Sequence, residues 1–209
     1  IEASPMERVI RRLAEANGLS DRIVVVNRVL QEISDQEVPE KVDVIVSETL
    51  GNCLLAERGI ETVVVARERF LKPDGKLFPC KAVLLAAPFC DDARHKSRMT
   101  ESLHFWTRKD FFGLDMTSAL DMSRTEVFNR PLGDTFHPDQ LKADPVMRDF
   151  DFRTLRSEEL ARFSFDYNFL IKDTCVVHGI ACWFEAIFEG SHCDLVLSTS
   201  PWDTLTHWW

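Results

Sequence analysis

The stretch "VDVIVSETLGNCLLAERGIETVVVARERFLKPDG", residues 42–75, decides how the chain folds. It begins with a β-branched run that is typical of a buried strand and continues with apolar residues at helical spacing. Two glutamates, Glu48 and Glu57, stand on either side of a loop that contains Gly51. Because parallel sheets bind ligands beyond the carboxyl ends of their strands, this pattern predicts a site that contains both carboxylates.

The flanking segments predict an alternation of helices and strands. Apolar residues three and four apart predict a helix over residues 5–18, and "RIVVVN" (22–27) and "VDVIVSE" (42–48) are expected to be parallel strands buried under helices. A second helix is expected over residues 54–71, ended by the Pro and Gly of "KPDGK" (72–76). This order is typical of a doubly wound α/β sheet.

The pattern changes at Phe78 and Pro79, where we expect a boundary between a domain of residues 1–79 and a domain of residues 80–209. The second domain is expected to be rich in strands, interrupted by a helical excursion over about residues 94–122. The strands are expected at residues 81–89, 163–169, 175–190 and 194–201.

Composition indicates a globular protein, since 45% of the 209 residues are hydrophobic and can fill a core. The formal net charge of −9 argues against binding to nucleic-acid phosphates and favours cationic partners, although it also serves solubility. The chain contains no apolar run of about 18 residues, so we expect no membrane span.

Six cysteines without any CxxC pair, mostly inside apolar runs, predict reduced core thiols in a cytoplasmic or nuclear protein. The chain begins with Ile1 rather than Met, from which we expect it to be a fragment. His178 and Cys182 share one face of the expected strand, but two ligands without a third favour core packing over a metal site.

The two glutamates of the loop admit several interpretations. A glycosidase pair would need a sugar cleft lined with aromatic residues, and a divalent metal would need further ligands, and the loop offers neither. A guanidinium has a planar fork of donors that two carboxylates can hold, which leaves one nitrogen rich in electron density. A purely structural salt bridge remains open. Glu2 stands before a helix, where an acidic residue binds ribose hydroxyls or caps the helix.

Several stretches together resemble the protein arginine methyltransferase family over essentially the whole chain. "SETLGNCLLAER" (47–58) resembles its double-glutamate loop, and "STSPWDTLTHW" (198–208) resembles its threonine-histidine-tryptophan loop. "FLKPDGKLFP", "FFGLDMTSAL" and "VVHGIACWF" are similar to its strand-to-barrel junction, dimerisation arm and barrel strand. The likeness is to the type I branch, and within it to the coactivator-associated enzymes.

The resemblance implies an α/β fold: a partial doubly wound, Rossmann-like sheet that binds S-adenosylmethionine, then a β-barrel with a helical dimerisation arm. It implies methyl transfer to arginine in proteins such as histones or Arg- and Gly-rich chains, by a homodimer or heterodimer, without a metal. The roles it implies are a guanidinium clamp and catalysis for Glu48, Glu57 and His207, cofactor contacts for Glu2, Ala3, Leu30, Gln31 and Glu48, and pocket walls for Leu50 and Trp208.

The chain departs from the family pattern in four respects. The Gly-rich cofactor turn, the N-terminal tyrosine helix and the last barrel strands are absent from it. The loop reads Leu50-Gly51-Asn52 where the family usually has Met-Gly-Tyr, and Gln31 replaces an acid. These departures keep open an inactive regulatory subunit that stabilises a partner methyltransferase. The aromatic arm segment predicts a docking surface, unless its rings pack back onto the barrel.

Overall fold

The computed structural model of the protein describes residues 1–208, and the chain divides into two compact units. The first unit comprises Ile1–Val83, Asp149–Phe165 and Ala186–Leu197, and the remaining described residues form the second. Helices and strands occur in both units, so the broad expectation of a mixed α/β fold is confirmed.

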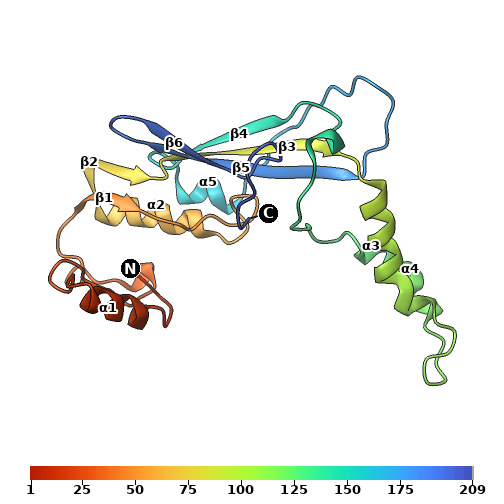
Figure 1. Cartoon of the computed structure of the whole chain (residues 1–209), viewed down its shortest axis with the longest axis horizontal. Coiled ribbons are helices and arrows are strands. Elements are labelled where there is room, and N and C mark those ends of the chain that lie inside the picture. Colours follow the sequence, from red (N-terminus) through yellow and green to blue (C-terminus); the bar gives the residue numbers. More distant parts are fainter. Residues whose placement is uncertain (209) are drawn as a thin grey trace. The chain divides into compact units, whose positions relative to one another are not determined.

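The first unit is built around a parallel strand–helix–strand motif. Strand β1 (Val42–Val46) is followed by helix α2 (Gly59–Phe70) and strand β2 (Leu71–Phe78), and β1 pairs with β2 in parallel (Figure 1). Helix α1 (Glu7–Ala16) confirms the predicted first helix. The second helix begins at residue 59 rather than 54, because the preceding residues form the loop that reverses the chain.

The segment 72–76 does not act as the predicted stop, since β2 runs through it. Helix α2 ends at Phe70, and the strand begins at the next residue. Val42 pairs with Leu71 whereas Val44 pairs with Lys76, so Pro73 and Gly75 lie in a bulge of β2. Pro and Gly are tolerated in strands at such irregularities, which explains why turn-forming residues occur inside this strand.

Two further expectations for the first unit are wrong. Residues 22–27 do not form a strand, because within the described chain their backbone lacks the ladder of a paired neighbour; one backbone–backbone hydrogen bond, from Glu2 N to Val26 O at 3.0 Å, joins them to Glu2. Strand β1 is not buried on both faces, since Val44 and Val46 are 46% and 74% exposed. Residues 22–27 have a high strand propensity, but without a neighbouring strand to pair with they remain extended and irregular.

The chain also contains a four-stranded sheet of order β4-β3-β5-β6. Its strands are β3 (Lys81–Phe89), β4 (Val146–Asp151), β5 (Gly179–Glu189) and β6 (Asp194–Ser198). Cys80 N donates to Ile187 O and His178 N donates to Phe89 O, so β3 and β5 are antiparallel. The predicted strands at 81–89, 175–190 and 194–201 are confirmed, the last two in shortened form.

The predicted helical excursion is confirmed and lies in the second unit. Helices α3 (Asp92–His104) and α4 (Leu120–Glu126) contact each other beyond the end of β3 (Figure 1). The turn between them has Phe112 at φ 53° and Gly113 at φ 83°, and Phe112 is 91% exposed. The remaining short helices are η1 (Leu30–Glu32), η2 (Phe105–Thr107), η3 (Thr117–Ala119), η4 (Pro138–Gln140) and α5 (Ser157–Ala161).

Residues 163–169 do not form the predicted strand. Their rings still stack in pairs two residues apart, Phe163 on Phe165 at 6.0 Å and Tyr167 on Phe169 at 5.7 Å, as an extended chain allows. The expectation of core cysteines is also mostly wrong, since Cys80 alone among the six is buried in the described chain; none of the six is disulfide-bonded there. None of the described helices is both long and apolar enough to span a bilayer.

Four charged side chains join the strands of the first unit. Lys81 contacts Glu189, and Arg153 contacts Glu189 at 2.6 Å and Asp151 at 2.6 Å. The hydrogen bond from Arg153 lowers the pKa of Asp151, and the hydrogen bond from Lys81 lowers the pKa of Glu189. Both carboxylates are therefore held in the ionised form by folding.

We predict that this group contributes to acid sensitivity. Because the folded pKa of Glu189 lies below its ordinary value of 4.5, its stabilisation is present above that pH and is lost as the pH falls through the folded pKa. Glu189→Gln should therefore reduce the fall in melting temperature between pH 7 and pH 3, measured by circular dichroism. Glu40→Gln, at an exposed position without an ion pair in residues 1–208, is the control. An unchanged fall in Glu189→Gln would contradict the assignment.

Candidate functional site

The loop of residues 47–58 carries the two glutamates and follows the carboxyl end of β1. Ser47 N donates to Phe78 O at 2.9 Å, which extends the pairing of β1 and β2 to the start of the loop. Leu50 and Leu54 are buried and anchor the loop to the core, whereas Glu48 and Glu57 are exposed. The sequence therefore folds here with its apolar residues inward and both carboxylates in solvent.

Two glycines bring the arms of this loop into direct contact. A Cβ on Gly51 would lie 2.7 Å from Glu57 N, and a Cβ on Gly59 would lie 2.1 Å from Thr49 O. Neither position has room for a side chain. The loop also has three non-glycine residues with left-handed backbone, Cys53, Leu54 and Arg58, at φ 49°, 66° and 56°. Such residues are uncommon and cluster at functional sites.

The side chains of Glu48 and Glu57 are without hydrogen-bond or ion-pair partners within residues 1–208. Arg58, the nearest arginine in the sequence, instead contacts Glu61 at 2.8 Å. The structural salt bridge that the sequence left open is thus not formed by either glutamate in this part of the chain. Both carboxylates remain available to an external cation.

Glu2 and Ala3 lie at the start of the first unit, before α1. One carboxylate oxygen of Glu2 accepts a hydrogen bond from Ser4 N at 2.7 Å, and this bond lowers the pKa of Glu2. Asn27 donates its side-chain N–H to Glu2 O at 2.7 Å, so the residue is fixed to the extended segment. The Glu2 carboxylate thus caps the local backbone in its ionised form, and the residue is half-exposed. Ala3 is exposed.

Leu30 and Gln31 begin the short helix η1. Leu30 packs with Ile33 and Phe70 and is 8% exposed, whereas Gln31 faces solvent. Arg69 of α2 donates to Leu30 O at 3.1 Å, which ties this segment to the helix that follows the glutamate loop. The structure therefore places Leu30 mainly in the core and presents Gln31 as the accessible side chain.

His207 and Trp208 lie in the second unit, on the loop after β6. Their rings are 3.7 Å apart, and Trp208 meets Phe184 of β5 edge to face at 5.5 Å. Phe184 N–H donates to Thr199 Oγ1 at 2.9 Å, and Thr199 N–H donates to Phe184 O at 3.0 Å. The loop is thus held to β5, with His207 exposed.

The structure assembles one cluster that the sequence pattern did not indicate. Cys90, Asp92 and His178 place their sulfur, oxygen and nitrogen atoms within 4.8 Å of one another. However, His178 Nδ1 accepts a hydrogen bond from Asp91 N at 3.1 Å, so the neutral ring carries its proton on Nε2, which lies 3.2 Å from Asp92 Oδ1. A metal-bound histidine normally donates through its second nitrogen, so this geometry favours an anchor for α3 over a metal site.

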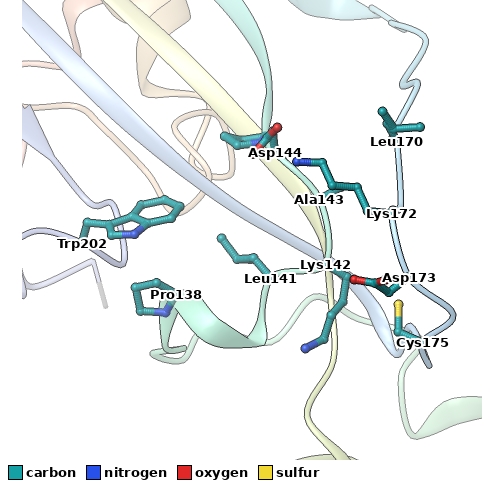
Figure 2. A pocket seen from close by; sticks show the side chains of 11 residues that line it. Pro138, Leu141, Lys142, Ala143, Asp144, Leu170, Lys172, Asp173, Cys175 and Trp202 are labelled. Carbon is teal, nitrogen blue, oxygen red and sulfur yellow. The ribbon is translucent and has the colours of Figure 1, made fainter.

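A hollow of about 490 Å³ also lies within the second unit (Figure 2). Trp202 forms one wall, and the other side carries Lys172 and Asp173 near Cys175. Two lysines and two aspartates line it, so it does not select one sign of charge. The remaining lining residues are Pro138, Leu141, Lys142, Ala143, Asp144, Pro145 and Leu170.

Comparison with known proteins bears on both units. The family model described as the arginine methyltransferase oligomerization subdomain matches residues 81–209. The "Probable histone-arginine methyltransferase CARM1" of Oryza sativa subsp. indica is 37% identical over 210 residues, which are 100% of this chain and 39% of that protein. The "Histone-arginine methyltransferase CARMER" of Anopheles gambiae is 36% identical over 209 residues, 100% of this chain and 33% of that protein.

Solved structures agree with these relatives. The Trypanosoma brucei PRMT1 enzyme-prozyme heterotetrameric complex with AdoHcy has a TM-score of 0.79 and 28% identity, over 99% of this chain and 61% of that one. Arabidopsis thaliana protein arginine methyltransferase 10 has a TM-score of 0.82 and 26% identity, over 99% and 64%. The chain spans 33–39% of the length of these curated relatives. It belongs to the protein arginine methyltransferase family and is similar to its CARM1 and CARMER members.

Proposed function

We propose that the protein transfers methyl groups from S-adenosylmethionine to the guanidino nitrogens of arginine in proteins, as a type I enzyme. The observation that carries the proposal is the pair of exposed carboxylates, Glu48 and Glu57, which have no hydrogen-bond or ion-pair partner within residues 1–208 and lie on a loop closed by glycine contacts. Relatives named as histone-arginine methyltransferases match the chain over its full length, which supports the same activity.

Glu48 and Glu57 would hold the substrate guanidinium by charge-assisted hydrogen bonds to its planar fork of donors. Two carboxylates draw the positive charge toward the nitrogens that they contact, so the remaining nitrogen becomes the better nucleophile. The loop orients this nitrogen, and the rate gain comes mainly from alignment and electrostatics. Neither the binding of the guanidinium nor the orientation of its nitrogen requires these residues to bind a metal.

The residues at the start of the first unit fit a cofactor with ribose hydroxyls. Glu2 is ionised and half-exposed, and Gln31 offers an accessible amide that can donate and accept hydrogen bonds. We assign Glu2, Ala3, Leu30, Gln31 and Glu48 to cofactor binding. When bound, S-adenosylmethionine supplies an electrophilic sulfonium methyl group. The relative in complex with AdoHcy supports this choice of cofactor.

Leu50, His207 and Trp208 are assigned to the arginine pocket, with His207 also counted among the catalytic residues. Trp208 has an aromatic ring fixed against Phe184, and such a ring can pack on a guanidinium face. Leu50 is only 5% exposed, so its role would be to support the loop from inside more than to contact substrate.

Two finer features of the fold belong to the same proposal. We assign residues 1–79 to the C-terminal part of a Rossmann-like cofactor domain, supported by the parallel pairing of β1 and β2. Residues 80–209 are assigned to a β-barrel substrate domain, supported by the family model that begins at residue 81. The antiparallel four-stranded sheet would form part of that barrel.

The arm of about residues 94–122 is assigned to dimerisation, with an identical or a homologous chain. Phe112 and Leu114 at its tip are 91% and 64% exposed, more apolar surface than an isolated turn normally presents. The name of the matching subdomain and the heterotetrameric relative support an oligomer.

Histones, or Arg- and Gly-rich proteins, are the proposed substrates, and the net charge of −9 suits such cationic chains. We propose a cytoplasmic or nuclear location without direct nucleic-acid binding or membrane association, supported by the absence of disulfides in the described residues. The alternative of an inactive regulatory subunit is not favoured, since the relatives bear enzyme names and both loop glutamates are present.

The activity is tested on the full-length protein with S-adenosylmethionine and histones or an Arg-Gly-rich peptide, with methyl addition followed by mass spectrometry. Asymmetric dimethylarginine is expected. Glu48→Gln and Glu57→Gln should each lower kcat/KM by roughly 100-fold or more, because each removes a charge that orients and polarises the guanidinium. Glu40→Gln is the matched control on the same unit. Full activity in both loop variants, or no methyl addition by the wild type, would sink the proposal.

The arm makes a second prediction. Phe112→Asp together with Leu114→Asp should convert a dimer to a monomer at micromolar concentration, because charged groups cannot be buried in an apolar interface. Sedimentation velocity gives the result, and Met122→Asp, also at an exposed apolar position of the arm region, shows whether the tip itself is required. A double variant that remains dimeric would rule out docking through the tip.

A further inference from the structure

The junction between the glutamate loop and α2 consists of Arg58 and Gly59. Arg58 precedes the helix with φ 56° and ψ 21°, and Gly59 is the first helical residue. A left-handed conformation is costly for a residue that has a Cβ, so the surroundings of Arg58 must hold it there. Glu57 is the residue immediately before this turn.

Gly59 rests directly on the other arm of the loop. A Cβ at this position would lie 2.1 Å from Thr49 O and 2.9 Å from Thr49 C. Thr49 follows Glu48, and Gly59 is two residues after Glu57, so this contact joins the chain segments that bear the two carboxylates. Any larger residue would force these segments apart, because backbone atoms cannot yield as a flexible side chain can.

The side chain of Arg58 turns back onto the first turn of α2. Its Nε donates to both oxygens of Glu61, at 2.9 and 3.1 Å, and its Nη2 donates to Glu61 Oε1 at 2.8 Å. This forked contact links a residue in a strained conformation to the rigid helix. It fixes the direction in which the chain leaves Glu57.

A hollow of about 350 Å³ adjoins the same turn in the first unit. Leu55, Arg58, Ile60 and Phe163 are among the residues that line it. Close packing therefore does not hold the loop on this side. Its conformation depends more on the contacts of Arg58 and Gly59 than it would if the loop were packed on all sides.

We infer that Arg58 and Gly59 are positioning residues that set the separation of the two guanidinium-binding carboxylates. The inference rests on the proposed function, since it assigns the pair a role in the same site. Neither residue is expected to contact substrate or cofactor. Gly59 sets how closely the two arms approach, and the ion pair of Arg58 with Glu61 sets the orientation of the turn after Glu57.

The first test is Gly59→Ala in the full-length protein. A shift of about 1 Å in a positioning element can cost on the order of 100-fold in rate, so kcat/KM for the arginine peptide should fall by roughly 10- to 100-fold. The dissociation constant of S-adenosylmethionine, measured by calorimetry, should stay within about threefold. The matched control is Gly179→Ala, because a Cβ there meets nothing within 4 Å. Equal activity of the Gly59 and Gly179 variants would overturn the inference.

A second series keeps the inference testable even if Gly59→Ala does not fold. Arg58→Ala should raise KM for the arginine peptide by about 2- to 5-fold, the range expected for an exposed ion pair, with little change in cofactor binding or melting temperature. Arg58→Gly should recover part of this loss, since glycine tolerates the left-handed turn. Arg58→Lys should have a KM for the arginine peptide above that of the wild type, because lysine lacks the planar fork of donors that contacts Glu61.

The outcomes distinguish failure of the proposed methyl transfer from failure of the positioning role of Arg58 and Gly59. A wild-type protein without methyl transfer defeats the proposed function and leaves this inference without a site. An active wild type whose Arg58 variants match it in KM defeats the inference alone. A loss of melting temperature that parallels the loss of activity across the Arg58 series would also defeat it, since general destabilisation would then account for the effect.

Discussion

The parallel pairing of β1 with β2 is the constraint on which the site depends. Parallel strands cannot be joined by a tight turn, so the chain must cross back through α2, and the loop between β1 and α2 necessarily lies at the carboxyl end of β1. The hydrogen bond from Ser47 to Phe78 carries that pairing to the edge of the loop. The two glutamates are displayed where they are because the strands run in the same direction.

The sequence predicts correctly those helices and strands that can be recognised from the periodicity of their own residues. The amphipathic spacing of residues 5–18, the apolar run of β3 and the helical arm were all recognisable, since each is defined by its own periodicity. Residues 22–27 and 163–169 have strand composition yet remain irregular, because a strand also requires a neighbour that composition does not specify. The Pro and Gly within β2 suggested a turn, and only the register shift shows that they form a bulge.

The candidate site divides in the same way. The two loop glutamates and Glu2 were identifiable because carboxylates after a strand or before a helix are a chemical signal, and the resemblance added His207 and Trp208. The contacts of Gly59 with Thr49 and of His178 with Asp91 were not identifiable, because backbone approaches between loops leave no spacing rule in the sequence. The sequence therefore predicts which residues take part in the candidate site, whereas only the structure shows the contacts that hold those residues in place.

The bulge of β2 has a consequence for how this region can vary. One residue of β1, Asp43, stands opposite the four residues Lys72–Gly75, while pairing resumes at Lys76 and continues to Phe78. A Cβ on Gly75 would lie 2.5 Å from Leu71 Cδ1, so this residue is fixed by packing, whereas a change in Lys72, Pro73 or Asp74 can be absorbed within the bulge and need not shift the alignment beyond it. The irregular part of β2 thus separates the pairing of Val42 with Leu71 from the pairing of Lys76–Phe78, which leads to the glutamate loop, so a change within it leaves the loop in register.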